Sequence, residues 1–527
     1  MLEFELPEPK DFDEVGEQLT GRLTLEPELP PPAAELSSLA ERTYYDTFDG
    51  RLHRASKQLL AVASKGRVEV RLHAQAPSGA RPIRERVSVL PRFAWDLPPG
   101  PLRAELEPIV EMRALLPQAR LRSEERRLAQ RDANGKTVVR LALERHELVT
   151  ADGRRPLCAR ARVEPLKGYA KASRRALRVL EQELRLERAE DLLTVALTAQ
   201  GRGPSGYSSR ITVALEPALR ADAAVKQILA EQCRTMLANV EGMCGEVDTE
   251  FLHDFRVAVR RSRSALSRIR GVFPSRTVER YRRELRWLGQ LTGPARDYDV
   301  YLLEFDELAS DLPRGLGRHL SPLKALLTER RHQSYDALRE ALQSRRGRRL
   351  LTDFEKYVTS GVPKSSGLPN ACRPIGEVAD EATWRSYRRV LRHGRTIGIA
   401  CPAAELHELR KRCKALRYML EFFRSLFPAE EIGRLVGELK SLQKILGAFQ
   451  DQEVQSIAAA RWGLELAPRP EVGPKTTLAL GALAQQLASR QEQSRRRFRG
   501  AYERFTCKDN RKLARSLLRS AKARNLP

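Results

Sequence analysis

The sequence predicts an α+β protein of two domains, with antiparallel strands in the N-terminal part and helices in the rest. Three observations lead to this prediction. Up to about residue 168, apolar and charged residues alternate with a period of two, which is typical of half-buried strands. From Pro217 onward the apolar residues recur every three or four positions, as on one face of a helix. The length of 527 residues is too great for a single core.

The N-terminal domain is predicted to be an antiparallel β-barrel or a β-sandwich. Its alternating stretches are separated by turn signals such as DG and NG, and they include RVEVRLHA at 67–74 and TVVRLALERHELVT at 137–150. A helical stretch follows Gly168. The Gly, Pro and Ser residues near 199–210 then indicate a boundary. We therefore assign residues 1–200 to this domain and 201–216 to a linker.

The helical part is an internal duplication. A segment rich in Gly, Pro and Ser at 359–376 divides it, so we predict helical bundles at 217–358 and 377–515 and a basic tail at 516–527. When His407 is placed on His253, residues 253–274 align with 407–428 without a gap, and the same shift continues through the next helix. Two copies of one helical unit are expected to pack about a pseudo-twofold axis.

The composition points to an anionic partner. The chain has 94 Lys and Arg against 68 Asp and Glu, a formal net charge of +26, which favours nucleic acid, an anionic membrane face or another polyanion. The seven cysteines lack metal-ligand spacing, the acidic N-terminus lacks a secretion signal, and no apolar run could cross a membrane. We therefore expect a cytoplasmic protein with reduced cysteines, no cofactor and no membrane contact.

Each copy of the repeat carries one basic stripe. The four matched positions are His253, Arg256, Arg260 and Arg263 in the first copy, and His407, Arg410, Lys414 and Arg417 in the second. At about 100° per residue, these positions fall within an arc of roughly 80°. No acid interrupts either stripe, although acid–base pairs usually relieve such repulsion. A single charge run is more often a solvated face, but its repetition in the same register favours anion binding.

Further candidates adjoin the stripes. Arg261 and Lys411 lie next to them, and two more matched pairs on later helices could widen the basic surface: Arg286 with Lys440, and Arg330 with Arg490. Asp297 and Asp451 follow matched glycines, a position more typical of a helix cap or an arginine partner than of a substrate contact. Metal binding by the two histidines is disfavoured because the surrounding guanidinium groups would repel a cation.

The duplicated pattern resembles the CHAD family. The residues that carry the resemblance are H-x-x-R-V-x-x-R-R-x-R from His253, the following FP, and G-x-x-R-D-x-x-V from Gly293, within roughly 218–515. The resemblance implies two pseudo-symmetric helical bundles whose basic surfaces and central pore bind inorganic polyphosphate. It also implies a cytoplasmic location, often at polyphosphate granules.

The N-terminal part resembles the CYTH domains, best in YYDTFDGRLHRASKQLL at 44–60. The resemblance implies an eight-stranded antiparallel tunnel that hydrolyses triphosphates with a divalent metal. The chain departs from the family pattern at several positions. Glu3 and Glu5 keep the opening E-x-E-x-K motif, but Pro7 replaces its lysine, Ala61 and Ala63 replace two arginines, and Arg140, Arg160 and Arg162 stand near expected glutamates. Most oxygen ligands for a metal are therefore missing, and we predict no catalytic residues and no metal site.

The leading hypothesis is a protein that binds inorganic polyphosphate. The alternative is a metal-dependent triphosphatase or polyphosphatase that uses Glu3 and Glu5 of the N-terminal domain. If they face inward, Arg67, Arg71, His73 and Arg160 could instead hold an anion in a non-catalytic tunnel. Nucleic acid is disfavoured because the stripes contain no aromatic residues on which bases could stack, although non-specific charge would still attract it.

Overall fold

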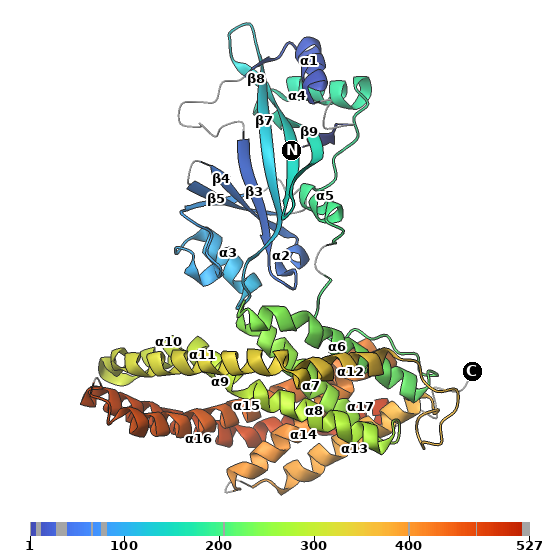
Figure 1. Ribbon diagram of the computed structural model, residues 1–527, viewed down its shortest axis with the longest axis vertical. Helices are drawn as coiled ribbons and strands as arrows, with labels where there is room; N and C mark the ends of the chain where they lie inside the picture. Colours follow the sequence, from blue (N-terminus) through green and yellow to red (C-terminus); the bar gives the residue numbers. More distant parts are fainter. Residues whose placement is uncertain are drawn as a thin grey trace. The chain divides into compact units, whose positions relative to one another are not determined.

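The computed structural model describes residues 2–6, 12–27, 39–64, 67–74, 82–203, 206–398, 401–470 and 472–518 (Figure 1). The chain divides into two compact units, Met1–Ser208 and Ser209–Pro527. The first unit holds the strands and the second holds only helices within its described residues, so the prediction of a strand-rich part followed by a helical part is confirmed. Among the described helices, none combines the length and the hydropathy that a membrane crossing requires.

The first unit is built on one antiparallel sheet. Its strands are β1 (Leu2–Glu5), β2 (Glu26–Pro27), β3 (Leu39–Asp46), β4 (Lys57–Ser64), β5 (Arg67–Ala74), β6 (Ile83–Val87), β7 (Leu116–Arg131), β8 (Thr137–Thr150) and β9 (Gly153–Pro165). The order across the sheet is β1-β9-β8-β7-β3-β4-β5-β6, and β2 pairs with β7. The helices of this unit are α1 (Phe12–Leu23), α2 (Arg51–Arg54), α3 (Pro101–Val110), α4 (Ala170–Arg178) and α5 (Leu192–Ala199).

The predicted closure of this sheet into a barrel is wrong. Within the described residues, the two edge strands β1 and β6 pair with β9 and β5 respectively and not with each other. Closure needs edge strands that can pair along their length at a fixed stagger. Here β1 has 4 residues and β6 has 5, against 16 in β7, so the edges offer few hydrogen-bonding groups for such a seam. The unit is an open antiparallel sheet, consistent with a CYTH-like fold.

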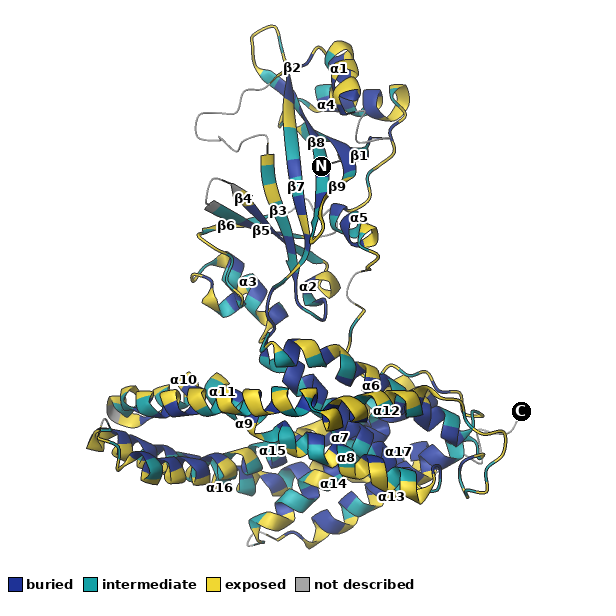
Figure 2. Cartoon of the chain, in the orientation of Figure 1, coloured by how far each residue is buried: buried dark blue, intermediate teal, exposed yellow. Residues whose placement is uncertain are grey.

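Helices cover both faces of the sheet. On one face, α1 and α4 pack on β7, β8 and β9 through Phe12, Leu143 and Ala176, and α3 packs on β4 and β5. On the other face, α5 packs on Tyr44 and Leu121. Figure 2 colours the buried residues of these helices and strands dark blue. Ala61 belongs to the core beneath α3, on the face opposite Arg42 and Glu144, so packing explains the small residue there.

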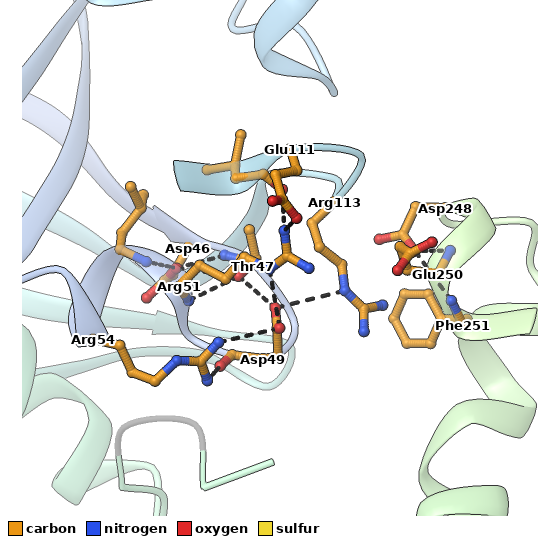
Figure 3. Close-up of polar contacts among 12 residues, drawn as sticks. Asp46, Thr47, Asp49, Arg51, Arg54, Glu111, Arg113, Asp248, Glu250 and Phe251 are labelled. Atoms are coloured by element: carbon orange, nitrogen blue, oxygen red, sulfur yellow. Dashed lines mark hydrogen bonds and ion pairs between the residues drawn. The ribbon is translucent and has the colours of Figure 1, made fainter. Parts of the chain in front are cut away.

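The turn after β3 is held by two aspartates. Asp46 accepts hydrogen bonds from the backbone N–H groups of Thr47 (2.7 Å), Leu52 (2.9 Å) and His53 (3.0 Å), and so fixes the start of α2. Asp49 lies among the guanidinium groups of Arg51, Arg54 and Arg113 (Figure 3). The next residue, Gly50, has φ of 67°, the left-handed conformation that glycine adopts without strain. The DG sequence therefore forms the turn that its composition predicts.

The second unit consists of twelve α-helices within the described residues. They are α6 (Ala221–Cys244), α7 (Thr249–Arg268), α8 (Ser275–Leu291), α9 (Gly293–Leu303), α10 (Phe305–Ser310), α11 (Ser321–Gln343), α12 (Arg345–Thr359), α13 (Ile375–Thr396), α14 (Ala403–Phe422), α15 (Ala429–Leu466), α16 (Pro474–Phe505) and α17 (Lys508–Leu518). Asp248 caps α7 by accepting from the N–H groups of Glu250 and Phe251, as Figure 3 also shows.

The duplication is visible in the order of the helices. In the aligned sequence α14 corresponds to α7, and the single helix α15 corresponds to α8 and α9 together. In the first copy the helix is interrupted between α8 and α9, because Pro294, near the start of α9, has no N–H group to donate to the preceding turn. Ala448 holds the matched position in the second copy, so α15 continues through it.

The two copies share one apolar core. At the ends of α15 and α16, Trp462 and Leu480 of the second copy pack with Phe305 and Leu323 of the first. Figure 1 shows α10 and α11 alongside α15 and α16 in this region, and α7 and α14 also pack on each other. The copies are therefore interlocked, and this fixes α7 relative to α14.

Candidate functional site

The basic stripes occupy the half-buried sides of α7 and α14. The predicted core positions beside them are buried: Phe255 and Val259 on α7, and Leu409 and Cys413 on α14, are all 0 % exposed. All eight stripe residues are half-buried, between that core and the surface. The apolar side of each helix therefore sets the direction of its stripe, as the sequence predicts.

The stripes converge at Lys414. Burial, together with the charges of Arg410, Arg260 and Arg417, lowers the pKa of this lysine to about 7, and Asp451 opposes the shift. Arg260 belongs to α7, so an effect on a side chain of α14 requires the two stripes to lie close together. The Lys414 ammonium group has no hydrogen bond or ion pair within the described part of the chain.

The two copies hold their first arginine in matched surroundings. Arg256 donates from Nη1 to the Gly289 carbonyl oxygen (3.3 Å) and to Thr292 Oγ1 (3.0 Å). Arg410 donates to Gln450 Oε1 (2.6 Å) and forms an ion pair with Asp451 (3.2 Å). A Cβ atom at Gly293 would lie 3.7 Å from the Arg256 guanidinium, and one at Gly447 would lie 3.8 Å from that of Arg410. The pseudo-symmetry thus extends to the side chains of the site.

The stripe on α14 is largely paired with acids. His407 Nε2 lies 2.6 Å from Glu453 Oε2, and Arg417 Nε lies 3.3 Å from Glu421 Oε1. Arg417 also donates to Gln443 Oε1 (3.0 Å). Together with Arg410 and its aspartate, three of the four residues on this stripe have an acidic neighbour within 4 Å.

The stripe on α7 is less compensated. The side chains of Arg260 and Arg263 form no ion pair or hydrogen bond within the described residues. The Nε groups of Arg256 and Arg260 are buried without a hydrogen-bond partner there. Burial lowers the pKa of Arg256 to about 10, with Arg260 adding to the effect, so this guanidinium remains charged at neutral pH. Positive charge that is not internally neutralised is therefore concentrated on α7, and Lys414 adds to it when its amine is protonated.

Arg261 and Lys411 have other roles than the stripes beside them. Arg261 is buried, donates to the Ser209 carbonyl oxygen (2.6 Å), and forms an ion pair with Glu421 of α14 (3.2 Å). It therefore ties α7 to α14. Lys411 is exposed and pairs with Glu408 (2.5 Å) on its own helix.

The first further pair, Arg286 and Lys440, is exposed on α8 and α15. The pKa of Arg263 is lowered first by burial and next by the charge of Arg286. Arg286 therefore lies close to the α7 stripe and extends it onto α8.

The second pair, Arg330 and Arg490, lies on α11 and α16 instead. Each is in an ion pair, with Glu465 and Asp311 respectively, beside the core that the two copies share. These two arginines therefore join elements of the two copies.

An acidic pair lies within the site. Burial raises the pKa of Asp297, Arg256 and Arg296 lower it, and its counterpart Asp451 raises it again, so the matched aspartates lie near each other. Asp451 holds Arg410, which is the arginine-partner role that the sequence predicts. Sequence reasoning missed the acceptors Glu421, Gln443 and Gln450. Only Glu421 gave a signal, because it lies four residues after Arg417.

The charged face of the first unit is neutralised by its own ion pairs. Glu144 is buried between Arg42 (2.9 Å) and Arg162 (3.3 Å), and Arg160 pairs with Glu3 (3.3 Å). Burial alone would raise the pKa of Glu144, but His146 and the two arginines hold it well below its usual range.

The metal implied by the CYTH resemblance does not fit these residues. Within the described ranges, no three His, Cys, Asp or Glu side chains come together as a metal site would require. Glu3 and Glu144 are each bound by an arginine, and Arg162 also pairs with Glu125 and Glu164, so these carboxylates are surrounded by charges that would repel a cation.

The other residues named for this unit are placed as follows. Arg160 is opposite Glu144 in the β8–β9 pair, and Arg140 and Arg162 lie on the same face of the sheet. Arg71 pairs with Glu69 (2.6 Å), and burial, with Arg71 and Arg84, lowers the pKa of His73. Pro7 and the Arg67 side chain lie outside the described residues.

Comparison with known proteins identifies the helical unit. Residues 227–460 match the family model of the CHAD domain, and this range contains both basic stripes. The second unit thus contains a CHAD domain.

Two curated relatives, uncharacterized proteins of Mycobacterium tuberculosis strains CDC 1551 / Oshkosh and H37Rv, are each 27% identical over 332 residues. The match covers 59% of this chain and only 60% of each relative. Among solved structures, the CHAD domain from the plant Ricinus communis is similar with a TM-score of 0.46 and 26% identity, over 56% of this chain and 96% of that chain. PptA from Streptomyces chartreusis is similar with a TM-score of 0.44 and 18% identity, over 54% of this chain and 100% of that chain.

Proposed function

We propose that the helical unit binds inorganic polyphosphate where α7 and α14 meet. The observation that carries the proposal is that Arg260 of α7 lies close to Lys414 of α14, with Arg263 one turn further along the α7 stripe. None of these three basic side chains forms an ion pair within the described residues. Like charges at this spacing repel one another, and buried N–H donors without acceptors destabilise the free protein. A row of phosphate oxygens would relieve both penalties, because guanidinium and ammonium groups form short, strong hydrogen bonds with phosphate.

A chain of phosphates suits this surface better than a single one. The α7 stripe runs from His253 to Arg263, ten residues further along the chain, or about 15 Å along the helix. A polyanion that contacts both stripes gains affinity because the first contact raises the effective concentration of the second. Binding of this kind would also support a cytoplasmic location at polyphosphate granules.

The two stripes should contribute unequally. A phosphate can contact Arg260 and Arg263 without breaking an ion pair, whereas at Arg410 and Arg417 it must compete with Asp451 and Glu421. The α7 stripe is therefore the main anchor in this proposal, and the α14 stripe extends it.

The test is a binding titration of the full chain with long-chain polyphosphate, inorganic triphosphate and single-stranded DNA at several salt concentrations. Replacing Arg256, Arg260 and Arg263 by Ala should weaken long-chain binding more than the same change at Arg410, Lys414 and Arg417. A matched control replaces three exposed arginines of α12 by Ala: Arg345, Arg348 and Arg349. The control removes the same charge, so equal losses in the control and the α7 variant would show that only net charge matters.

Salt dependence gives a second measurement. If phosphates displace counterions, the log–log slope should be about 0.7 per neutralised phosphate, by analogy with single-stranded nucleic acid. The α7 variant should have a shallower slope than the wild type. Tighter binding of single-stranded DNA than of polyphosphate at equal length would instead favour nucleic acid as the partner.

A further inference from the structure

A basic pocket separate from the two stripes lies at the junction of α16 and α17. Its volume is about 690 Å³, and it is lined by Glu503, Thr506, Cys507, Lys508, Arg511, Lys512 and Arg515. Four of the lining residues are cations on α17: Lys508, Arg511, Lys512 and Arg515. The last three lie three, four and seven residues after Lys508, and this helical spacing places all four within an arc of about 100° around the helix. The helix therefore presents one basic side to the pocket.

The charges of this pocket are not neutralised internally. Its single acid, Glu503, accepts a hydrogen bond from Arg499 (2.6 Å), which lies one turn earlier on α16. Lys508, Arg511, Lys512 and Arg515 form no ion pair within the described residues. Cations three and four residues apart on a helix repel one another, so this arrangement favours an anion.

A buried hydroxyl group adjoins these cations. Tyr387 of α13 is 1 % exposed, and its hydroxyl has no hydrogen-bond partner among the described residues. Burial raises the pKa of Tyr387 to about 12, while Arg511 and Arg515 lower it, so both guanidinium groups lie near the hydroxyl. The buried Nε of Arg511 also lacks a partner. Arg511 lines the basic pocket, and Tyr387 lies behind that lining, near Arg511 and Arg515. Each of the two buried donors carries the penalty of an unmade hydrogen bond.

The pocket does not arise from the duplication. At the shift of 160 residues that relates Arg330 to Arg490, Arg511 and Arg515 correspond to Leu351 and Glu355 of α12. The cationic row is therefore present only in the second copy, unlike the stripes on α7 and α14.

We propose that this pocket binds a small anion with two or three linked phosphate groups, independently of the α7 and α14 stripes. Four cations match several phosphate charges, and the row from Lys508 to Arg515 is about 10 Å long, which exceeds the reach of a single phosphate. The Tyr387 hydroxyl and Arg511 Nε would donate to the innermost phosphate oxygens.

The chain carries its own probe for this site. Cys507 lines the pocket and is exposed, and Cys372, which is also exposed, lies outside the pocket lining. The experiment measures the rate of alkylation of both thiols by iodoacetamide in the full chain, by mass spectrometry, with and without inorganic triphosphate. A bound polyanion raises the pKa of a neighbouring thiol, and one unit of pKa lowers the thiolate fraction tenfold. Alkylation of Cys507 should therefore slow about tenfold, while that of Cys372 stays unchanged.

Three variants test whether the protection of Cys507 comes from an anion held in this pocket. Arg511→Ala with Arg515→Ala should abolish the protection of Cys507. Tyr387→Phe should weaken the protection and leave Tm without triphosphate unchanged or higher, because the hydroxyl has no partner to lose. The variant of the α7 stripe should keep full protection, whether or not that stripe binds polyphosphate. Equal slowing at both cysteines, no slowing at Cys507, or loss of protection in the α7 variant would each overturn the proposal.

Discussion

Lys414 should take up a proton when polyphosphate binds to the α7 and α14 stripes. In the free protein, burial and then Arg410 and Arg260 lower its pKa to about 7. At pH 8 only about a tenth of the molecules would carry the ammonium charge. A phosphate chain across the stripes would favour that charge and return the pKa toward the ordinary value of about 10.4. The neutral amine of the free protein would thus become a cation in the complex.

The size of the effect follows from these two pKa values. At pH 8 the complex would hold about 0.9 proton more than the free partners, and affinity would fall about tenfold per pH unit above pH 7. The window from pH 8 to pH 9 is suitable because a terminal phosphate, with a second pKa of about 6, is already ionised there. If the pKa of Lys414 returned only part of the way toward about 10.4, the pH range of the effect would be narrower, but affinity would still fall as the pH rises.

Proton uptake can be measured by calorimetry in two buffers with different ionisation enthalpies. The apparent enthalpy of binding should differ between the buffers at pH 8, and Lys414→Gln should remove the difference. Lys440→Gln is the control, because it removes an exposed lysine of α15 and should preserve the uptake. Identical enthalpies in both buffers for the wild type would refute the assignment of a neutral Lys414 in the free protein.

The same pKa predicts a pH dependence of stability without ligand. The folded pKa lies below the unfolded one, so between about pH 7 and pH 10.4 the unfolded chain binds more protons than the folded chain. This residue therefore makes the free energy of unfolding rise with pH in that window. Lys414→Met should flatten the dependence, as urea titrations at several pH values would show.

Three further predictions concern the fold. Gly242→Ala should lower the free energy of unfolding by about 1–3 kcal/mol, because the new Cβ would lie 2.3 Å from the ring of Phe251. The control is Gly433→Ala, where the space around the glycine is open; in the same urea titration it should raise the free energy of unfolding by about 0.5–1 kcal/mol. Glu421→Gln should lower the free energy of unfolding by about 1–3 kcal/mol, because Arg261 of α7 and Arg417 of α14 both lose an ionised partner. An unfolding midpoint equal to that of the wild type would contradict this role of Glu421. Glu144→Gln should cost about 3–5 kcal/mol, because it removes the charge of a buried carboxylate and leaves half-buried Arg42 unpaired. The lowered pKa of Glu144 means that its contribution to stability is present above about pH 4.5 and is lost as the pH falls; amide hydrogen exchange in β8 should report both changes.

Local pattern determined the order of the elements and the direction of the stripes. The change of period from two to 3.6 separated the strands from the helices, because side-chain alternation is a property of a few neighbouring residues. The repeat placed Phe255 and Leu409 in the core, so Arg256 and Arg410 had to lie at its edge. These features needed no knowledge of distant contacts.

Closure of the sheet depended on contacts between distant segments. The alternating pattern of strands is the same in an open sheet and in a barrel, because it reports only which side of each strand is buried. Whether β1 can meet β6 depends on the lengths of these edge strands and on the helices that cover the faces between them.

Only the tertiary structure decided which cations remain available to an anion. Arg410 and Arg260 both belong to the predicted stripes, yet the first faces Asp451 of another helix while the second has no acidic partner in the described chain. Likewise, Arg330 repeats as Arg490, but each pairs with an acid from the other copy. A stripe of charge is a local property of one helix, whereas its neutralisation depends on acceptors that the fold brings from elsewhere in the chain.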